Sequence, residues 1–176
     1  MAKKRVIGDP FDLKTEHGPQ INQINMDRIL GLIDKGIKDG SVLKTGGKRI
    51  GDRGFFIQPT VFADVQDHHI LATAEIFGPV QQLLKFDKID EVLKRANDSK
   101  YGLGAGIYTH DMEKINYLMQ GLKAGSVWVN GYGVMGPHIP FGGYKDSGWG
   151  RENGEYCLQQ YTEVKNVVIK IKKKSS

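Results

Sequence analysis

The order of apolar runs between residues 79 and 130 is the feature that most constrains the fold of this chain. Strand-like runs at residues 79–86, 104–109 and 125–130 alternate with two segments of helical periodicity. Strands that alternate with helices are joined by crossover connections, which favour parallel strands covered by helices on both faces. The sequence therefore predicts an α/β protein with a mainly parallel sheet and crossover helices.

Aspartates predict where these two helices begin, because an aspartate at the N-cap accepts a hydrogen bond from a free backbone N–H of the first turn. Asp87 or Asp90 can cap the first helix, which should run to about Asn97, and Asp111 can cap the second. The apolar positions then fall on one face of each helix: Val92, Leu93 and Ala96 in the first, and Ile115, Leu118 and Leu122 in the second.

A third helix is predicted near the N-terminus. Pro19 suits the first turn of a helix, where the missing N–H costs nothing, and Gly40 is a candidate C-cap. Apolar residues recur between them at near-helical spacing, which predicts a buried face. These residues are Ile21, Ile24, Ile29, Leu32, Ile33 and Ile37.

Further strands are predicted on both sides of the alternating region. Residues 41–44 are typical of a short strand, and residues 55–62 are β-prone. Pro59 cannot donate to a ladder, so the second of these strands is expected at an edge or with a bulge. A short helical pattern at residues 154–160 precedes a final strand at residues 164–171, whose polar face suits a sheet edge.

Residues 131–150 are rich in glycine and proline and show no periodicity. A loop this long in a compact domain is typically functional or disordered. Residues 131–136 match the G-x-G-x-x-G spacing of dinucleotide-binding loops, but such a loop must open a helix whose N-terminus holds pyrophosphate. Prolines at positions 137 and 140 oppose a helix there, so we predict a flexible glycine loop instead.

Composition and charge argue against several classes of function. With 39% hydrophobic and 26% charged residues the chain is typical of a soluble globular protein, and no apolar stretch approaches the roughly 20 residues that span a bilayer. No apolar run follows the basic start, so no signal peptide is predicted. Much of the +5 formal charge lies at the two ends, where we expect solvation rather than nucleic-acid binding. These charges are Lys3, Lys4 and Arg5 at the start and Lys170, Lys172, Lys173 and Lys174 at the finish.

The single cysteine and the histidine pair do not form a recognisable site. No base motif surrounds Cys157, which is therefore expected to be a small buried side chain rather than a nucleophile. A single cysteine also fits a reducing compartment, and the cytoplasm is the expected location. His68 and His69 are adjacent and have no carboxylate or thiol at ligand spacing, so no metal site is predicted.

Several motifs together resemble one enzyme family. They are Glu75-Ile76-Phe77-Gly78-Pro79, Val127-Trp128-Val129-Asn130, Pro140-Phe141-Gly142-Gly143-Tyr144-Lys145, Ser147-Gly148 and Gly150-Arg151. In order and spacing they resemble the C-terminal part of the aldehyde dehydrogenase superfamily, a group of NAD(P)-linked oxidoreductases. The resemblance runs from about residue 6 to residue 170. Residues 54–60 and 161–165 are most similar to the group that acts on general aldehydes or retinal.

The resemblance implies binding roles for five side chains. In the family, the glutamate of the E-I-F-G-P motif binds the nicotinamide ribose and its phenylalanine contacts the nicotinamide end, which makes Glu75 and Phe77 candidate NAD contacts. Without the resemblance, the same pair would be interpreted as a solvated carboxylate and a core aromatic ring. The loop after V-W-V-N lines the aldehyde tunnel in the family, so Tyr132, Met135 and Phe141 are candidate tunnel residues. The choice between NAD and NADP stays open.

Small residues in the same loop bear on the size of the substrate. Gly131 and Gly133 stand where some relatives carry bulkier groups, which predicts a wider tunnel and larger aldehyde substrates.

The resemblance also implies what this stretch does not contain. In the family, a cysteine thiolate attacks the aldehyde carbonyl, hydride passes to NAD, and a glutamate-activated water hydrolyses the thioester. That cysteine, that glutamate, the oxyanion-hole asparagine and the Rossmann-like domain lie upstream, so no catalytic residue is expected in this chain. Residues 1–150 are expected to be part of the catalytic domain, and residues 151–176 to form a C-terminal helix, an oligomerisation strand and a basic tail.

Two functions from different classes therefore stay open. The chain is expected to be part of an NAD-dependent aldehyde dehydrogenase that assembles into a homo-oligomer through residues 164–171. The alternative is a truncated, catalytically inactive binding or structural protein derived from that fold, which pairs with full-length relatives through the same strand. The mitochondrial matrix stays open beside the cytoplasm as its location.

Overall fold

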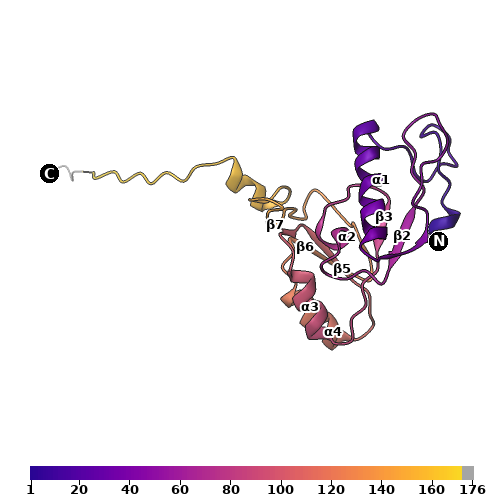
Figure 1. Ribbon diagram of the computed structural model, residues 1–176. Helices are drawn as coiled ribbons and strands as arrows, with labels where there is room; N and C mark the ends of the chain where they lie inside the picture. Colours follow the sequence, from indigo (N-terminus) through magenta and orange to yellow (C-terminus); the bar gives the residue numbers. More distant parts are fainter. Residues whose placement is uncertain (172–176) are drawn as a thin grey trace, which may run out of the picture. The chain divides into compact units, whose positions relative to one another are not determined.

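The computed structural model describes residues 1–171, and the chain divides into two compact units, Met1–Lys88 and Ile89–Ser176 (Figure 1). The first unit contains η1 (Ala2–Lys4), α1 (Gln23–Lys38), β1 (Val42–Thr45), β2 (Thr60–Ala63), α2 (Ile70–Thr73) and β3 (Val80–Gln82). The second contains α3 (Ile89–Asn97), β4 (Tyr101–Gly102), β5 (Gly104–Ile107), α4 (Met112–Gly121), β6 (Ser126–Val129), β7 (Tyr144–Lys145) and η2 (Glu155–Gln160). The two units are defined by the contacts within each of them. The expected functional boundary after residue 150 stays a prediction.

The α/β class is confirmed, and the sheets are mixed. In the first unit the strand order is β1-β2-β3, with β1 antiparallel and β3 parallel to β2. In the second unit β5 and β6 are parallel and joined through α4, while β4 and β7 are antiparallel. The predicted order of strands and helices between residues 79 and 130 is therefore present. Half of the strand pairings among the described residues are parallel, so parallel pairing does not dominate.

The first helix begins later than Pro19 suggested. The backbone N–H of Gln20 donates to the Phe55 carbonyl at 2.9 Å, which holds the chain outside a helix at that point. The side chain of Asn22 then accepts from the N–H of Asn25 and caps the helix. Ile21 therefore lies before the helix and is 83% exposed. Ile24 lies in the first turn of α1 but is not among its buried residues, and it is 80% exposed. Both were expected on the buried face.

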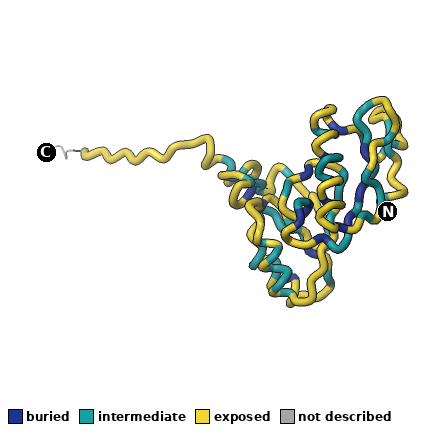
Figure 2. The backbone as a smooth tube through the Cα atoms, viewed as in Figure 1, coloured by how far each residue is buried: buried dark blue, intermediate teal, exposed yellow. Residues whose placement is uncertain are grey.

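The other end of α1 follows the prediction. Gly40 has a φ of +92° directly after the helix, and its N–H donates to the Ile37 carbonyl at 3.1 Å. Ile29 and Ile33 are fully buried and join the core of the first unit, which Figure 2 shows as the dark blue stretches of α1 and β2. That core consists of Met26, Ile29, Ile33, Ile57, Phe62, Val65, Leu71 and Ile76.

Pro59 does not place its strand at an edge, as its missing N–H had suggested. β2 begins at Thr60, immediately after the proline, and is the central strand of its sheet. Every residue of β2 therefore keeps its N–H for the ladder. A register shift between Leu43 and Thr45 places the bulge in β1 instead.

The helices of the second unit begin close to the predicted positions. α3 spans Ile89–Asn97, and Asp111 caps α4 by accepting from the N–H groups of Glu113 and Lys114. The bond from the Lys114 backbone holds the pKa of Asp111 below its ordinary value. Ile115 is buried as predicted, but α3 has no buried residue and Ala96 is exposed.

The final strand predicted at residues 164–171 does not form within the chain. These residues have no assigned secondary structure, and Figure 2 colours them as exposed. A strand needs a neighbour for its backbone hydrogen bonds, and this segment has none among residues 1–171. The basic-tail residues Lys172, Lys173 and Lys174 lie outside the described residues.

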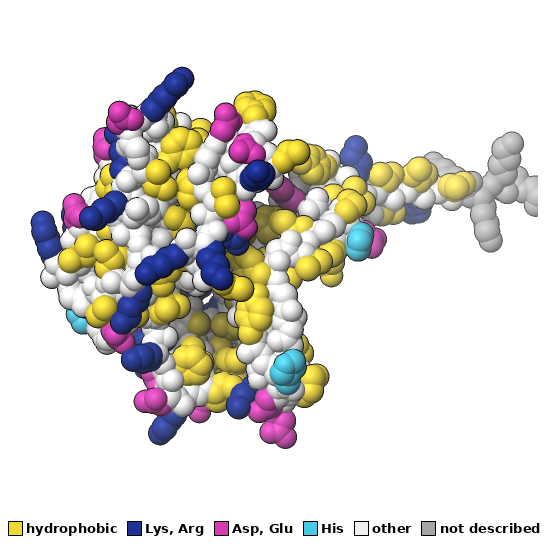
Figure 3. All heavy atoms as spheres, turned by 90° about the vertical axis from the view of Figure 1, so that its right-hand side faces the viewer, with side chains coloured by type: hydrophobic (Ala, Val, Ile, Leu, Met, Phe, Trp, Pro, Cys, Tyr) yellow, Lys and Arg dark blue, Asp and Glu magenta, His cyan; other side chains and the backbone are white. Residues whose placement is uncertain are grey.

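On the face in Figure 3, lysine and arginine side chains lie among acidic and apolar ones. In the part of the chain that the structure describes, no helix has the length and apolar character needed to cross a membrane.

Candidate functional site

The turn between α2 and β3 exposes both candidate cofactor residues. Ile76 is only 6% exposed and belongs to the core, whereas Glu75 is exposed and Phe77 is 75% exposed. The buried isoleucine thus anchors the turn, and the residues on either side of it face solvent. A carboxylate that can accept from hydroxyl groups and an aromatic ring that can pack on a flat ligand are available on one turn.

The backbone of this turn has an unusual conformation. Phe77 has a φ of +53°, in the left-handed region, which costs a residue with a side chain about 1–2 kcal/mol. Gly78 follows, and a Cβ added there would lie 2.5 Å from the Cδ1 atom of Ile29, so α1 packs directly against the turn. Only a glycine permits this close approach.

Side chains of α1 hold the turn in this conformation. Nη1 of Arg28 donates to the Ile76 carbonyl at 2.7 Å, and Nη2 donates to the Glu75 carbonyl. Nδ2 of Asn25 reaches the Phe77 carbonyl at 3.4 Å. Arg28 and Asn25 could not be predicted as partners of this turn, because no local pattern relates them to a motif about fifty residues away.

The second group of candidate residues lies in the second unit, around a cavity of about 280 Å³. Met135 and Phe141 both line it, and their role as walls of an aldehyde tunnel stays a prediction. The walls are mainly apolar and come from β6 and from the loop that follows it. The remaining lining residues are Gly125, Ser126, Val127, Trp128, Val134, Ile139, Pro140 and Asn153.

Tyr132 does not line this cavity but contacts a residue that does. Its ring lies 4.8 Å from the ring of Trp128, and the side chain is 67% exposed. Nε1 of Trp128 donates to the Val134 carbonyl at 3.0 Å. The same indole therefore contacts both Tyr132 and the backbone of the loop at Val134. Asn130 forms the turn after β6, with a φ of +52° and paired hydrogen bonds to the backbone of Thr109.

The loop at residues 131–150 is held at its C-terminal end. Phe141 and Glu152 exchange two backbone hydrogen bonds of 2.8 Å, and Nη1 of Arg151 donates to the Gly143 carbonyl at 3.0 Å. Nζ of Lys145 donates to the carbonyls of Asn97 and Ser99 at the end of α3. Residues 131–136 form no helix.

The single cysteine is bonded within the second unit. Cys157 is half-buried rather than buried, and its Sγ donates to the Gly154 carbonyl at 3.0 Å. Cys157 lies in the short helix η2, and among residues 1–171 its thiol makes no hydrogen bond to a basic side chain.

The histidine pair serves the fold of the first unit. The rings of His68 and His69 meet edge to face at 4.7 Å, and Nδ1 of the buried His69 bonds Oγ of Ser41 at 2.7 Å. Among residues 1–171, no three His, Cys, Asp or Glu side chains are grouped so that they could hold a metal ion.

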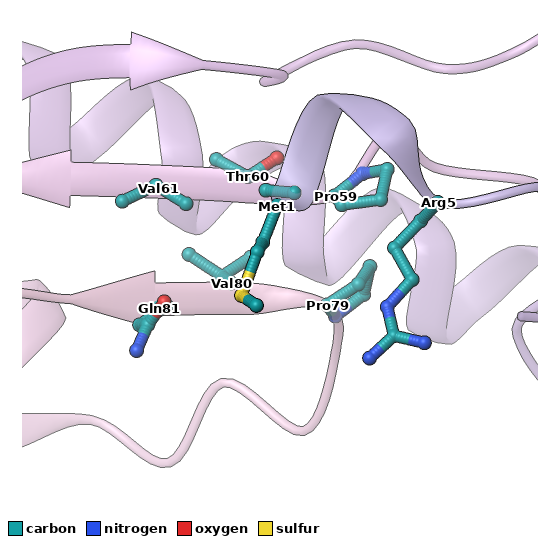
Figure 4. Close-up of a pocket in the computed structure, with 9 residues that line it drawn as sticks. Met1, Arg5, Pro59, Thr60, Val61, Pro79, Val80 and Gln81 are labelled. Carbon is teal, nitrogen blue, oxygen red and sulfur yellow. The ribbon is translucent and has the colours of Figure 1, made fainter.

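A second cavity, of about 370 Å³, lies over the starts of β2 and β3 (Figure 4). Its lining includes Pro59, Pro79 and the side chain of Arg5, which also pairs with Glu16 at 3.1 Å. None of the candidate cofactor or tunnel residues lines it.

Comparison with known proteins places this geometry in a family. Residues 1–167 match the model of the aldehyde dehydrogenase family. The chain is 58% identical to human mitochondrial aldehyde dehydrogenase over 99% of its own length and 34% of that protein, and 57% identical to the horse enzyme over 99% and 35%. It is also 54% identical to rat retinaldehyde dehydrogenase 3 over 99% of the chain and 34% of that protein.

Solved structures agree with the sequence relatives. An NAD+ complex of an aldehyde dehydrogenase from Bacillus cereus superposes with a TM-score of 0.94 and 44% identity, covering 98% of this chain and 35% of that one. The chain thus spans about a third of the length of the relatives that it matches. On this shared sequence and fold, the chain belongs to the aldehyde dehydrogenase family.

Proposed function

We propose that this chain is part of an NAD-dependent aldehyde dehydrogenase that oxidises aldehydes to carboxylic acids. In this proposal Glu75 and Phe77 contact the nicotinamide ribose and the nicotinamide ring, and Tyr132, Met135 and Phe141 form part of the wall of the aldehyde tunnel. The observation that carries the proposal is the turn at Ile76, which buries its central residue and exposes the two proposed cofactor contacts.

The exposed groups of the turn fit the cofactor chemically. The carboxylate of Glu75 can accept from two adjacent ribose hydroxyls, and the exposed ring of Phe77 can pack against a flat heteroaromatic ring. NAD supplies the acceptor for the hydride that leaves the substrate. The residues of this chain bind and orient, whereas the nucleophilic cysteine and the general base are proposed to come from residues outside these 176. Cys157 is not a candidate, because its thiol is directed at the Gly154 carbonyl.

The cofactor role of Glu75 predicts a selective loss of affinity. In the native protein that contains this chain, Glu75→Gln is expected to raise the KM for NAD about tenfold, because hydrogen bonds from hydroxyls to a charged acceptor are replaced by weaker neutral ones. Steady-state kinetics at saturating aldehyde would measure this change. Asp34→Asn removes the same charge from the exposed side of α1 and should leave KM unchanged. Equal KM values for Glu75→Gln and the unaltered enzyme would contradict the role.

The glycines of the tunnel loop predict a preference for larger substrates. Gly133 has a φ of +75° with no heavy atom within 4 Å of the position of a Cβ, so it leaves open space in the loop. The complete enzyme is expected to turn over a long or cyclic aldehyde at least as well as acetaldehyde. Gly133→Asn, whose side chain tolerates the left-handed region, should reduce turnover of the larger substrate more than that of acetaldehyde. A preference of the unaltered enzyme for acetaldehyde would count against a wide tunnel.

We further propose that residues 164–171 pair with a neighbouring subunit in a homo-oligomer. Their apolar side chains are exposed along the segment, and Val164 and Val168 are 102% and 85% exposed. Apolar side chains beside unpaired backbone groups favour the addition of a strand from another chain. Residues 1–150 would then belong to the catalytic domain and residues 151–176 to the oligomerisation region, in an enzyme of the cytoplasm or the mitochondrial matrix.

The native mass of the gene product distinguishes this proposal from the inactive alternative. An antibody against this segment should detect, in source cells, a band near the size of the full-length relatives. A band at the mass of the chain alone would favour a binding or structural protein that pairs with intact subunits, and co-purification with such a subunit would then test that function.

A further inference from the structure

A buried pair of hydrogen-bonded side chains in the first unit belongs to neither proposed binding site. Ser41 and His69 are each only 5% exposed, and Oγ of Ser41 lies 2.7 Å from Nδ1 of His69. Ser41 directly precedes β1, and its backbone N–H donates to the Gly36 carbonyl near the end of α1 at 3.0 Å. His69 lies at the N-terminal end of α2. The pair therefore joins two segments that are 28 residues apart in the sequence.

A second hydrogen bond fixes which nitrogen of the His69 ring carries the proton. The backbone N–H of Gln66 donates to the same Nδ1 atom at 3.3 Å. A backbone N–H can only donate, so Nδ1 must be the acceptor, and in a neutral imidazole the proton then lies on Nε2. The hydroxyl of Ser41 consequently donates to Nδ1 as well. Two donors thus converge on one ring nitrogen, which favours the neutral form of the ring.

A proton on Nδ1 would oppose this arrangement. The imidazolium carries N–H groups at both nitrogens and accepts no hydrogen bond. The Ser41 hydroxyl can rotate and accept instead of donating, but the N–H of Gln66 cannot, so two N–H groups would face each other at this contact. The positive charge would also lie at a position that is only 5% exposed, where most of its hydration is lost.

The backbone around His69 depends on the position of this ring. The N–H of His69 donates to the Gln66 carbonyl at 3.0 Å, and the His69 carbonyl accepts from the N–H of Ala72 at 2.9 Å. α2 has only four residues, so few hydrogen bonds of its own maintain it. Release of the ring should therefore loosen both the turn at residues 66–69 and α2.

Charged and titratable groups lie around the ring on several sides. From α1, the C-cap residue Asp39 accepts through Oδ2 from the N–H of Ile70 at 2.9 Å, which attaches the start of α2 independently of the ring. From the same loop, the exposed ring of His68 meets that of His69 edge to face at 4.7 Å, and Asp67 precedes both. The neighbouring elements add Lys35 and Lys38 in the last turn of α1, and Asp64 with Lys44 and Lys85 beside it. Between about pH 5.5 and pH 7.5 carboxylates and ammonium groups ordinarily keep their charge, so a change of charge in this range comes from histidine.

We propose that the His69–Ser41 pair is a pH-sensitive clip that holds residues 66–73 against the end of α1 and opens when the imidazole gains a proton. In the open form the ring meets water and titrates as an exposed histidine does, half protonated at about pH 6.5. The closed form accepts no proton at Nδ1, so each unit of pH below that value favours opening about tenfold. Opening is therefore rare above neutral pH and increases as the pH falls. Neither residue belongs to the groups proposed to bind NAD or the aldehyde, so the clip is independent of the proposed function.

Hydrogen exchange of the purified protein, followed by mass spectrometry at about pH 7.5 and about pH 5.5, tests the clip. After correction for the intrinsic pH dependence of exchange, the protection of residues 66–73 is expected to fall about tenfold at the lower pH. His69→Asn places a side-chain oxygen, which accepts but does not titrate, where Nδ1 lies, so its protection should be equal at both pH values. His68→Asn removes the neighbouring exposed imidazole and should behave as the unaltered protein does.

Three results of this experiment would overturn the clip. They are equal protection of residues 66–73 at both pH values in the unaltered protein, a fall in His69→Asn as large as in the unaltered protein, and loss of the pH dependence in His68→Asn. NMR of protein labelled with ¹⁵N-histidine keeps the clip testable should His69→Asn fail to fold. At about pH 7.5 the ring shifts of His69 should show a proton on Nε2 and none on Nδ1, and a proton on Nδ1 at that pH would refute the clip.

Discussion

Gly125→Ala is expected to destabilise the second unit by about 3 kcal/mol, at the upper end of what overpacking costs. A Cβ added at this position would lie 1.6 Å from the carbonyl oxygen of Gly142 and 2.7 Å from its carbonyl carbon. Both atoms belong to the backbone, so no side-chain rotation relieves the overlap. The neighbouring Phe141 is fixed to Glu152 by two backbone hydrogen bonds, which prevents a local shift without loss of those bonds.

Urea denaturation of the purified protein, followed by circular dichroism, measures this loss. Gly31→Ala is the matched control, since a Cβ added at Gly31 meets no heavy atom within 4 Å and the residue lies inside α1. Alanine favours a helix over glycine by up to about 1 kcal/mol, so the same chemical change should stabilise the protein there. A Gly125→Ala protein as stable as the unaltered one would show that residues 141–143 can move away from β6.

Phe62→Ala is expected to destabilise the first unit by about 3–5 kcal/mol, because it removes a fully buried aromatic ring and leaves a cavity. Phe62 lies in the central strand, opposite Leu43 of β1 and Gln82 of β3, and its ring packs in the core. Few neighbours can collapse into the space, since strands lie on both sides. The midpoint of urea unfolding should fall while the slope of the transition stays the same.

Val61→Ala is the control for this variant. Val61 is the adjacent residue of the same strand, so its side chain points to the opposite face, and it is only half-buried. Its truncation should cost clearly less than that of Phe62. Equal losses for the two variants would show that the core lies on both faces of β2 rather than on the α1 face alone.

Features set by neighbouring residues were the ones that the sequence predicted well. The cap at Asp111, the left-handed Gly40 after α1 and the order of strands and helices from residue 79 to residue 130 all follow from interactions within a few positions. The binding roles of Glu75 and Phe77, expected from a local motif, stay predictions, and the structure shows that both residues are exposed.

Predictions that depended on distant partners were less successful. Helical spacing placed Ile21 on the buried face of the first helix, but the bond from Gln20 to Phe55 delays the start of α1 and leaves Ile21 exposed. Pro59 suggested an edge strand, whereas pairing with β1 and β3 makes β2 central. In both cases local propensity was overridden by contacts that no sequence window contains.

The sequence by itself determined the family, the α/β class and the residues that carry the proposed binding chemistry, because short motifs and local periodicity encode them. Only the tertiary structure decided that Arg28 holds the Glu75–Phe77 backbone, that Gly125 lies against Gly142, and that Met135 and Phe141 share a cavity. The physical reason is that hydrogen bonds and close packing act over a few ångströms in space. Residues far apart in the chain reach that range only after the helices and strands between them have packed.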